Sequence, residues 1–147
     1  MKISTRARYG TRALLDLALH EGHEPVLLRD IAERQEISLN YLEHLIAPLV
    51  ARGMVRSTRG ARGGVWLAMS PRNIRLSEII QLFEGSTAPV ECVDKPEVCN
   101  RSKSCATLDV WREVKSAIDG VLESITLQDL VEKQRSKEKS AEKMYYI

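Results

Sequence analysis

Three cysteines gathered in one short stretch are the clearest candidates for chemistry in this 147-residue chain. Cys92, Cys99 and Cys105 are its only cysteines, with six residues between the first two and five between the last two. Thiolates are soft ligands for iron and zinc, and they also form disulfides and react with oxidants. Because Pro96 and the polar residues between the cysteines follow neither a helical nor a strand period, the pattern predicts a loop.

Four kinds of site are compatible with this spacing. A zinc site usually has four ligands, and the Cys-x-x-Cys pairs of many zinc sites are absent here. A regulatory disulfide would use two of the thiols, whereas purely structural cysteines are more often dispersed among apolar neighbours. An iron–sulfur cluster takes thiolates from a flexible loop and accepts one other ligand in the fourth place.

The composition indicates a compact protein with no membrane partner. A hydrophobic content of 44% is enough for one core, and the apolar run near the N-terminus is interrupted by Arg12 and Asp16. We therefore expect neither a signal peptide nor a membrane span, and a cytoplasmic location where thiols stay reduced. All three histidines lie away from the cysteines in sequence, so no general base is at hand and we expect no enzymatic activity.

Basic residues are unevenly distributed, although the formal net charge is only +2. Every ionised side chain between residues 1 and 15 is basic, and so is every one between residues 52 and 75. Two such segments could line one surface that faces phosphate, which makes double-stranded DNA the expected partner.

The elements that would present these charges predict a winged helix-turn-helix domain over residues 1–84. Ser38 can cap a helix whose apolar residues form one stripe and which Gly53 ends. Two short runs, 54–58 and 65–68, follow as a hairpin joined by a turn of arginines and glycines. In such a domain the capped helix enters the major groove and the hairpin, or wing, follows the backbone or reaches the minor groove.

The remainder predicts a dimerisation unit. Residues 85–105 form the cysteine-bearing loop, and residues 106–131 a long helix followed by a short capping helix. Apolar side chains recur every three or four residues along the long helix, so we expect it to pair with a second copy rather than to pack across its own head. Residues 132–147 are charged and aperiodic, which predicts a mobile tail. The expected fold class is thus mainly α, with a small β-hairpin wing and a long dimerisation helix.

Several motifs in the same order resemble the family of iron–sulfur cluster regulators typified by IscR. They are the opening Met-Lys-Ile-Ser-Thr-Arg-Ala-Arg-Tyr-Gly, the run from Ile31 to Glu43, the Arg59-Gly-Ala-Arg-Gly-Gly wing, the three cysteines, and Leu122-Glu-Ser-Ile-Thr-Leu-Gln-Asp-Leu. The resemblance covers residues 1 to about 134. It implies a homodimeric transcription factor whose DNA binding responds to a [2Fe–2S] cluster supplied by the cluster-assembly machinery.

The resemblance also implies site residues. The cluster ligands would be Cys92, Cys99 and Cys105, and the DNA-binding residues would be Ser38, Asn40, Tyr41, Glu43, His44, Arg59, Gly60 and Arg62. Among these, Glu43 could discriminate between operators, because a carboxylate accepts from cytosine N4 and is repelled by phosphate.

One position departs from the family pattern. Where well-studied members have a histidine three residues after the last cysteine, this chain has Leu108, which cannot bind iron. Asp109 lies on the same helical face as Cys105 and is one candidate for the fourth ligand. Asp94, Glu97, a residue of the partner's N-terminal helix or a small thiol are others. Other relatives in this family sense redox state or nitric oxide, so these two signals are alternatives to cluster occupancy.

Overall fold

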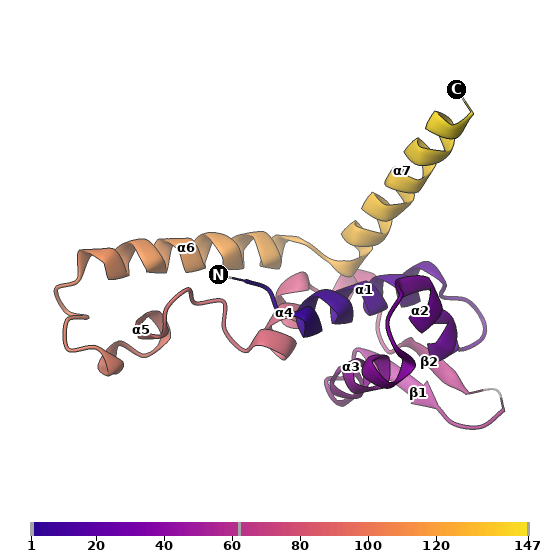
Figure 1. The fold of residues 1–147 in the computed structure, drawn as a ribbon, viewed down its shortest axis with the longest axis horizontal. Helices are drawn as coiled ribbons and strands as arrows, with labels where there is room; N and C mark the ends of the chain where they lie inside the picture. Colours follow the sequence, from indigo (N-terminus) through magenta and orange to yellow (C-terminus); the bar gives the residue numbers. More distant parts are fainter. Residues whose placement is uncertain (1, 62, 147) are drawn as a thin grey trace.

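The computed structural model describes residues 2–61 and 63–146 and confirms a mainly helical fold with a two-stranded antiparallel hairpin. Its elements in chain order (Figure 1) are α1 (Thr5–Leu19), α2 (Leu28–Gln35), α3 (Leu39–Ala51), β1 (Val55–Thr58), β2 (Gly64–Leu67), η1 (Pro71–Asn73), α4 (Leu76–Glu84), α5 (Glu91–Asp94), η2 (Pro96–Val98), α6 (Ala106–Ser124) and α7 (Leu127–Tyr145). Within the described residues, no helix combines the length and the apolar character needed to cross a bilayer.

Helix α1 is the central element of the head, which comprises α1–α4, the hairpin and the start of α7. It contacts α2, α3, α4, α7 and β2. Its apolar side chains recur every three or four residues, and Leu14 and Leu17 are completely buried. Ser4 caps the helix, since its hydroxyl accepts from the Ala7 N–H at 3.1 Å. Helix α4 packs closely on α1, because a Cβ at Gly10 would lie 2.3 Å from the Phe83 ring.

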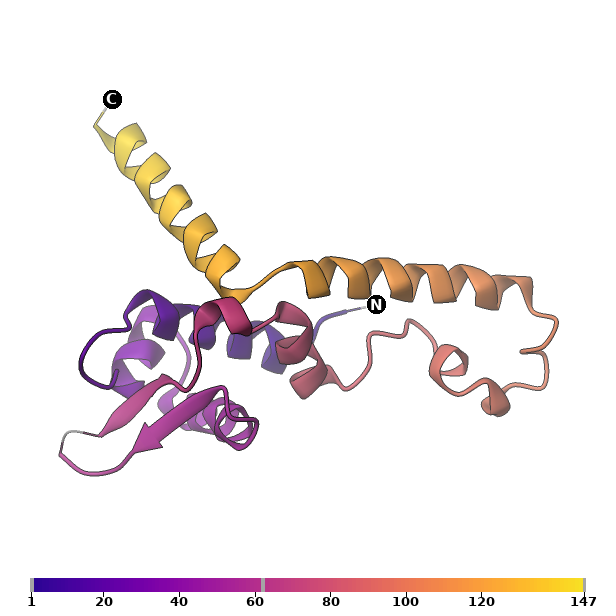
Figure 2. The same ribbon diagram turned by 180° about the vertical axis from the view of Figure 1, so that it is seen from behind.

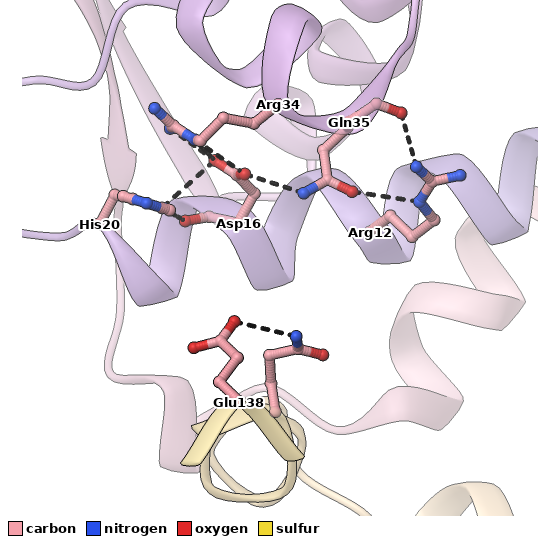
Figure 3. A network of polar contacts seen from close by, with 7 residues as sticks. Arg12, Asp16, His20, Arg34, Gln35 and Glu138 are labelled. Carbon is pink, nitrogen blue, oxygen red and sulfur yellow. Dashed lines mark hydrogen bonds and ion pairs between the residues drawn. The ribbon is translucent and has the colours of Figure 1, made fainter. Parts of the chain in front are cut away.

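A buried carboxylate joins α1 to α2 (Figure 3). Asp16, only 1% exposed, accepts hydrogen bonds from Arg34 Nη2 at 2.7 Å and from Gln35 Nε2 at 2.8 Å. The hydrogen bonds to Asp16 raise the pKa of Arg34 above its ordinary value. Arg12 in turn donates to the side chain and the backbone carbonyl of Gln35. This network fixes the C-terminal end of α2, where the helix-turn-helix connection begins.

Beyond α4 the chain leaves the head and forms an arm, defined here as residues 86–124 (Figures 1 and 2). The predicted loop contains two short helical turns, α5 and η2, because Glu91 and Pro96 begin local backbone hydrogen bonds. Helix α6 then runs back towards the head and contacts α5 and α4. Hydrogen bonds from Ser86 to Asp94 and from Thr87 to Asp119 hold the start of the arm, just after α4, against α5 and α6.

The chain returns to the head after α6, so the head does not end at residue 84. The Leu127 N–H donates to the Ile74 carbonyl at 2.8 Å, and the Leu76 N–H donates to the Ile125 carbonyl at 2.8 Å. Leu127 and Val131 are buried in the same core as α1. The start of α7 therefore completes the head rather than capping the dimerisation helix alone.

Helix α7 also differs from the prediction in length. The short helix and irregular tail expected after Thr126 are one helix of 19 residues reaching Tyr145. Thr126 and Asp129 form a capping box, and Gln134 donates to Glu138 one turn on (Figure 3). The Lys, Glu, Gln and Arg residues that suggested a charged tail are all good helix formers. Its mobility stays a prediction.

Candidate nucleic-acid interface and cysteine site

Helix α3 presents a polar face to solvent at its N-terminal end. The predicted cap is present: the Ser38 hydroxyl accepts from the Tyr41 N–H at 3.2 Å. Leu42, Leu45, Ile46 and Leu49 are buried on the opposite face, and this amphipathic pattern fixes the rotation of the helix. Asn40, Glu43 and His44 are consequently exposed.

Tyr41 has a different environment from the other residues of this set. Its side chain is half-buried, and its ring meets that of Tyr9 edge to face, with centroids 6.2 Å apart. The ring therefore joins α3 to α1. Of the predicted reading residues on α3, Tyr41 is the one whose ring is engaged inside the head.

The wing lies beside α3, and the two enclose a groove. Strands β1 and β2 pair from Val55↔Leu67 to Thr58↔Gly64, and Val26 adds a bridge to Val65. The turn carries Arg59 and Gly60, both exposed, whereas Arg62 lies outside the described residues. Gly60 has a φ of +105°, a conformation that suits glycine. Glu43 and Arg59 both line the groove, whose volume is about 670 Å³.

Some basic residues outside this groove form hydrogen bonds to other parts of the chain. The sequence predicted that two acid-free segments could line one phosphate-facing surface. Arg12 is bonded to Gln35 instead, and the Arg75 guanidinium donates to the Glu123 carbonyl at the end of α6. Sequence reasoning missed these ties because their partners lie 23 and 48 residues away.

The three cysteines lie at the end of the arm far from the wing (Figure 1). Cys92 is in α5, Cys99 follows η2, and Cys105 is the N-cap residue of α6. All three are free thiols and half-buried. The sequence and the fold therefore agree on a shared location, although the structure gives each thiol a separate local setting.

The three thiols are suitable ligands for an iron–sulfur cluster, but their arrangement in this structure does not form a ligand set. Across residues 2–61 and 63–146, no three His, Cys, Asp or Glu side chains are grouped as metal ligands. Leu108 is only 1% exposed and fills an apolar position at the start of α6. The Asp109 side chain is 74% exposed and pairs with Arg112 at 3.5 Å. The chain thus offers three thiolates, and neither residue provides an assembled fourth ligand.

Cys105 has the most distinctive local chemistry of the three. Its sulfur lies 3.1 Å from Thr107 Oγ1. This hydrogen bond and the backbone N–H of Leu108 hold the pKa of Cys105 below its ordinary value, against the opposing charge of Asp109. Thr107 was not predicted as a site residue. A Cys-x-Thr sequence at a helix start is the signal that could have identified it.

A capped reading helix beside a two-stranded wing, carried on a three-helix scaffold, defines a winged helix-turn-helix regulator. The family model described as "Rrf2: Iron-dependent Transcriptional regulator" matches residues 3–133. The chain belongs to the Rrf2 family, whose members are transcriptional regulators and not enzymes.

Three relatives span most of the chain. It is 44% identical over 131 residues to Protein rrf2 of Nitratidesulfovibrio vulgaris, covering 89% of this chain and 87% of that protein. It is 39% identical over 130 residues to the regulator CymR of Bacillus subtilis, covering 88% and 89% of the two. It is 40% identical over 134 residues to the regulator IscR of Serratia proteamaculans, covering 91% and 81%.

Solved structures show the same fold. T. potens IscR superposes with a TM-score of 0.74 at 43% identity, covering 91% of this chain and 88% of that one. CymR of B. subtilis, described as a global cysteine regulator, superposes with a TM-score of 0.75 at 37% identity, covering 90% and 98%. The chain is therefore similar to regulators with two different descriptions, IscR and a global cysteine regulator.

Proposed function

We propose that this chain is a transcriptional regulator that binds operator DNA as a homodimer and senses an iron–sulfur cluster through Cys92, Cys99 and Cys105. The observation that carries the proposal is the placement of three half-buried free thiols at the far end of an arm that projects from a winged head (Figure 2). A change in that arm can alter how two heads are held relative to each other.

The reading surface would consist of the exposed α3 residues and the wing turn. Asn40, Glu43 and His44 would face the major groove, while Ser38, Tyr41 and Gly60 would hold the register and Arg59 would enter or follow a groove. Arg62 belongs to this surface by its place in the wing sequence. Replacing Arg59 by Ala should weaken operator binding by about 1–3 kcal/mol if it reads a base.

Helix α6 supports a dimer. Over its 19 residues it buries only Leu108 and Leu122, whereas Val110, Trp111 and Val121 are 51%, 38% and 59% exposed. Val110, Val114, Ala117 and Val121 follow helical spacing on one face. An exposed apolar stripe of this kind is most simply covered by the same helix of a second copy.

This dimer proposal is tested by sedimentation velocity. Val121→Glu should shift the protein to the monomer and abolish binding to a two-fold operator. The matched control Glu123→Gln changes an exposed α6 side chain on the opposite side of the helix from that stripe and should leave the dimer intact. A Val121→Glu protein that remains dimeric would exclude α6 as the interface.

The cluster proposal depends on three thiolates that the cluster-assembly machinery could load. Cys92, Cys99 and Cys105 would hold the cluster. Its iron would make the regulator responsive to oxidants and to the availability of iron. The fourth ligand is not Leu108. Asp109 is a weak candidate, because it would first have to leave Arg112.

Anaerobic reconstitution tests the cluster. Iron and sulfide analysis, together with visible absorption, should show a cluster in the wild-type protein and none in Cys99→Ser. Binding of both forms to a panel of operators should then differ in relative affinity. A reconstituted protein without iron, or identical relative affinities with and without it, would contradict the cluster proposal.

A second candidate is a regulator that senses redox state or nitric oxide through the same cysteines, with or without a metal. The lowered pKa of Cys105 favours it, because the thiolate is the form that reacts. Metal-free protein whose DNA affinity changes on mild oxidation and returns on reduction would support this alternative.

A further inference from the structure

Leu39 is a large apolar side chain exposed on the reading helix. It is the first residue of α3, directly after the Ser38 cap, and it is 44% exposed. It does not belong to the apolar residues that form or line the core in the described part of the chain. Single exposed leucines are common on proteins, so its meaning depends on what surrounds it.

The neighbours of Leu39 are the groups that face DNA in the proposed function. Asn40 is the next residue, and Glu43 lies one helical turn further on the same side of α3. Glu43 lines the groove between α3 and the wing together with Arg59. Because a helical Cβ points towards the N-terminus, the Leu39 side chain extends beyond the start of α3. It therefore lies at the leading edge of the surface that would enter the major groove.

We propose that Leu39 is a specificity-determining residue that contacts the C5-methyl group of thymine in the operator. Thymine is the base whose major-groove edge carries a methyl group, and apolar side chains recognise it by excluding water from both surfaces. The carboxylate of Glu43, next to Leu39, accepts hydrogen bonds and makes no favourable contact with a methyl group. The pair would thus read two different features on neighbouring bases. This inference rests on the proposed DNA binding by α3.

The experiment removes the methyl group without changing any hydrogen bond. A duplex bound by the wild-type protein is first selected from a random-sequence pool. Every thymine in its two half-sites is then replaced by deoxyuridine, and both duplexes are titrated in the same salt. Wild-type affinity should fall about fourfold for each methyl contacted, and roughly 15-fold when both half-sites of a dimer site lose one.

Leu39→Ala should bind the thymine duplex as weakly as the wild type binds the uracil duplex, and it should no longer distinguish the two. Met69→Ala is the control, because Met69 is a similarly exposed apolar residue, 40% exposed, outside α3. It should keep the full response to uracil. Circular dichroism checks that Leu39→Ala folds, which its exposed position in the first turn favours.

Several outcomes overturn the inference while leaving the proposed function intact. A wild-type protein that binds both duplexes equally contradicts it, as does a Leu39→Ala protein that still loses affinity with uracil. A selected site without thymine in its half-sites does so too. Failure of the wild-type protein to enrich any sequence is a different result, which counts against DNA binding itself.

Discussion

In the head, α1 contacts four other helices and a strand, whereas in the arm α6 buries only two of its 19 residues. The head also satisfies Asp16, the one buried charged side chain among its described residues, with Arg34 and Gln35. The arm leaves thiols and apolar side chains partly exposed. The difference indicates that the head forms its core within one chain, whereas in the proposed dimer the arm would gain further burial from a second copy or a ligand.

The junction between the two regions combines apolar and polar contacts, because Leu122 of α6 belongs to the hydrophobic core of the head. The Ser4 N–H donates to Glu84 at 2.8 Å, and just beyond Glu84, at the start of the arm, the side chains of Ser86 and Thr87 bond to α5 and α6. A rearrangement at Cys92 would lie two residues from Asp94, which accepts a hydrogen bond from Ser86. Under the proposed function, a change in the arm would reach α4 and so α1, because α6 and α4 pack against each other.

The largest predicted effect comes from replacing one fully buried leucine by alanine in each region and comparing the two losses of stability. Leu17→Ala in α1 should lower the free energy of unfolding by about 3 kcal/mol, because the site is fully enclosed and leaves a cavity. Urea unfolding monitored by circular dichroism measures this loss.

Leu108→Ala is the matched variant in the arm, since Leu108 is also only 1% exposed. The variant is made in the Val121→Glu protein, which is expected to be a monomer. There it should leave the main unfolding transition nearly unchanged, and it should increase protease cleavage near the cysteines. Equal losses of stability in both variants would show that the arm folds as one unit with the head.

The second effect concerns the buried charge in the head. Asp16→Asn retains the shape but removes the ion pair with Arg34, which is 34% exposed and can partly recover its hydration. We expect a loss of about 2 kcal/mol in unfolding free energy. Operator affinity should fall as well, because Gln35 at the end of α2 loses an acceptor. A stability change below about 0.5 kcal/mol would mean that the network orders the head without stabilising it.

Much of the head could be predicted from the sequence because local signals and packing agree there. Ser38 acts as the predicted N-cap of α3. The apolar stripe of α3 and the turn glycines set the recognition helix and the wing. The return of α7 to the head could not be predicted, because it depends on hydrogen bonds of Ile74 and Leu76 with residues about 50 positions away.

The candidate sites were predictable to different degrees. Exposure of Asn40, Glu43 and His44 follows from the helical period, and the structure agrees. Clustering in sequence indicated that Cys92, Cys99 and Cys105 share a region, but not that Thr107 would bond to one of them. Ligand geometry depends on the conformation of the whole arm, which spacing does not determine.

A smaller effect is expected from pH within the arm. Burial opposes ionisation of Asp119, but hydrogen bonds from Lys115 and Thr87 outweigh it and hold the pKa of Asp119 below its ordinary value. A carboxylate with a lowered folded pKa stabilises the protein above its unfolded pKa of about 3.9, and this contribution is lost as pH falls through the folded pKa. The wild type should lose about 0.5 kcal/mol more than Asp119→Asn between pH 6 and pH 3. Parallel stability curves for the two proteins would exclude this contribution.

The smallest predicted effect is kinetic and confined to the arm. Thr107→Val removes the hydroxyl that lowers the pKa of Cys105 and should slow alkylation of that thiol a few-fold at pH 7. The change is modest because a thiolate of higher pKa is also the stronger nucleophile. Mass spectrometry of iodoacetamide-treated protein can follow each cysteine separately, with Cys92 and Cys99 as internal controls. The head should show no response, since its unfolding free energy does not depend on this contact. Slower alkylation of all three cysteines would point to a general rearrangement of the arm, and an unchanged rate for Cys105 would remove Thr107 from its chemistry.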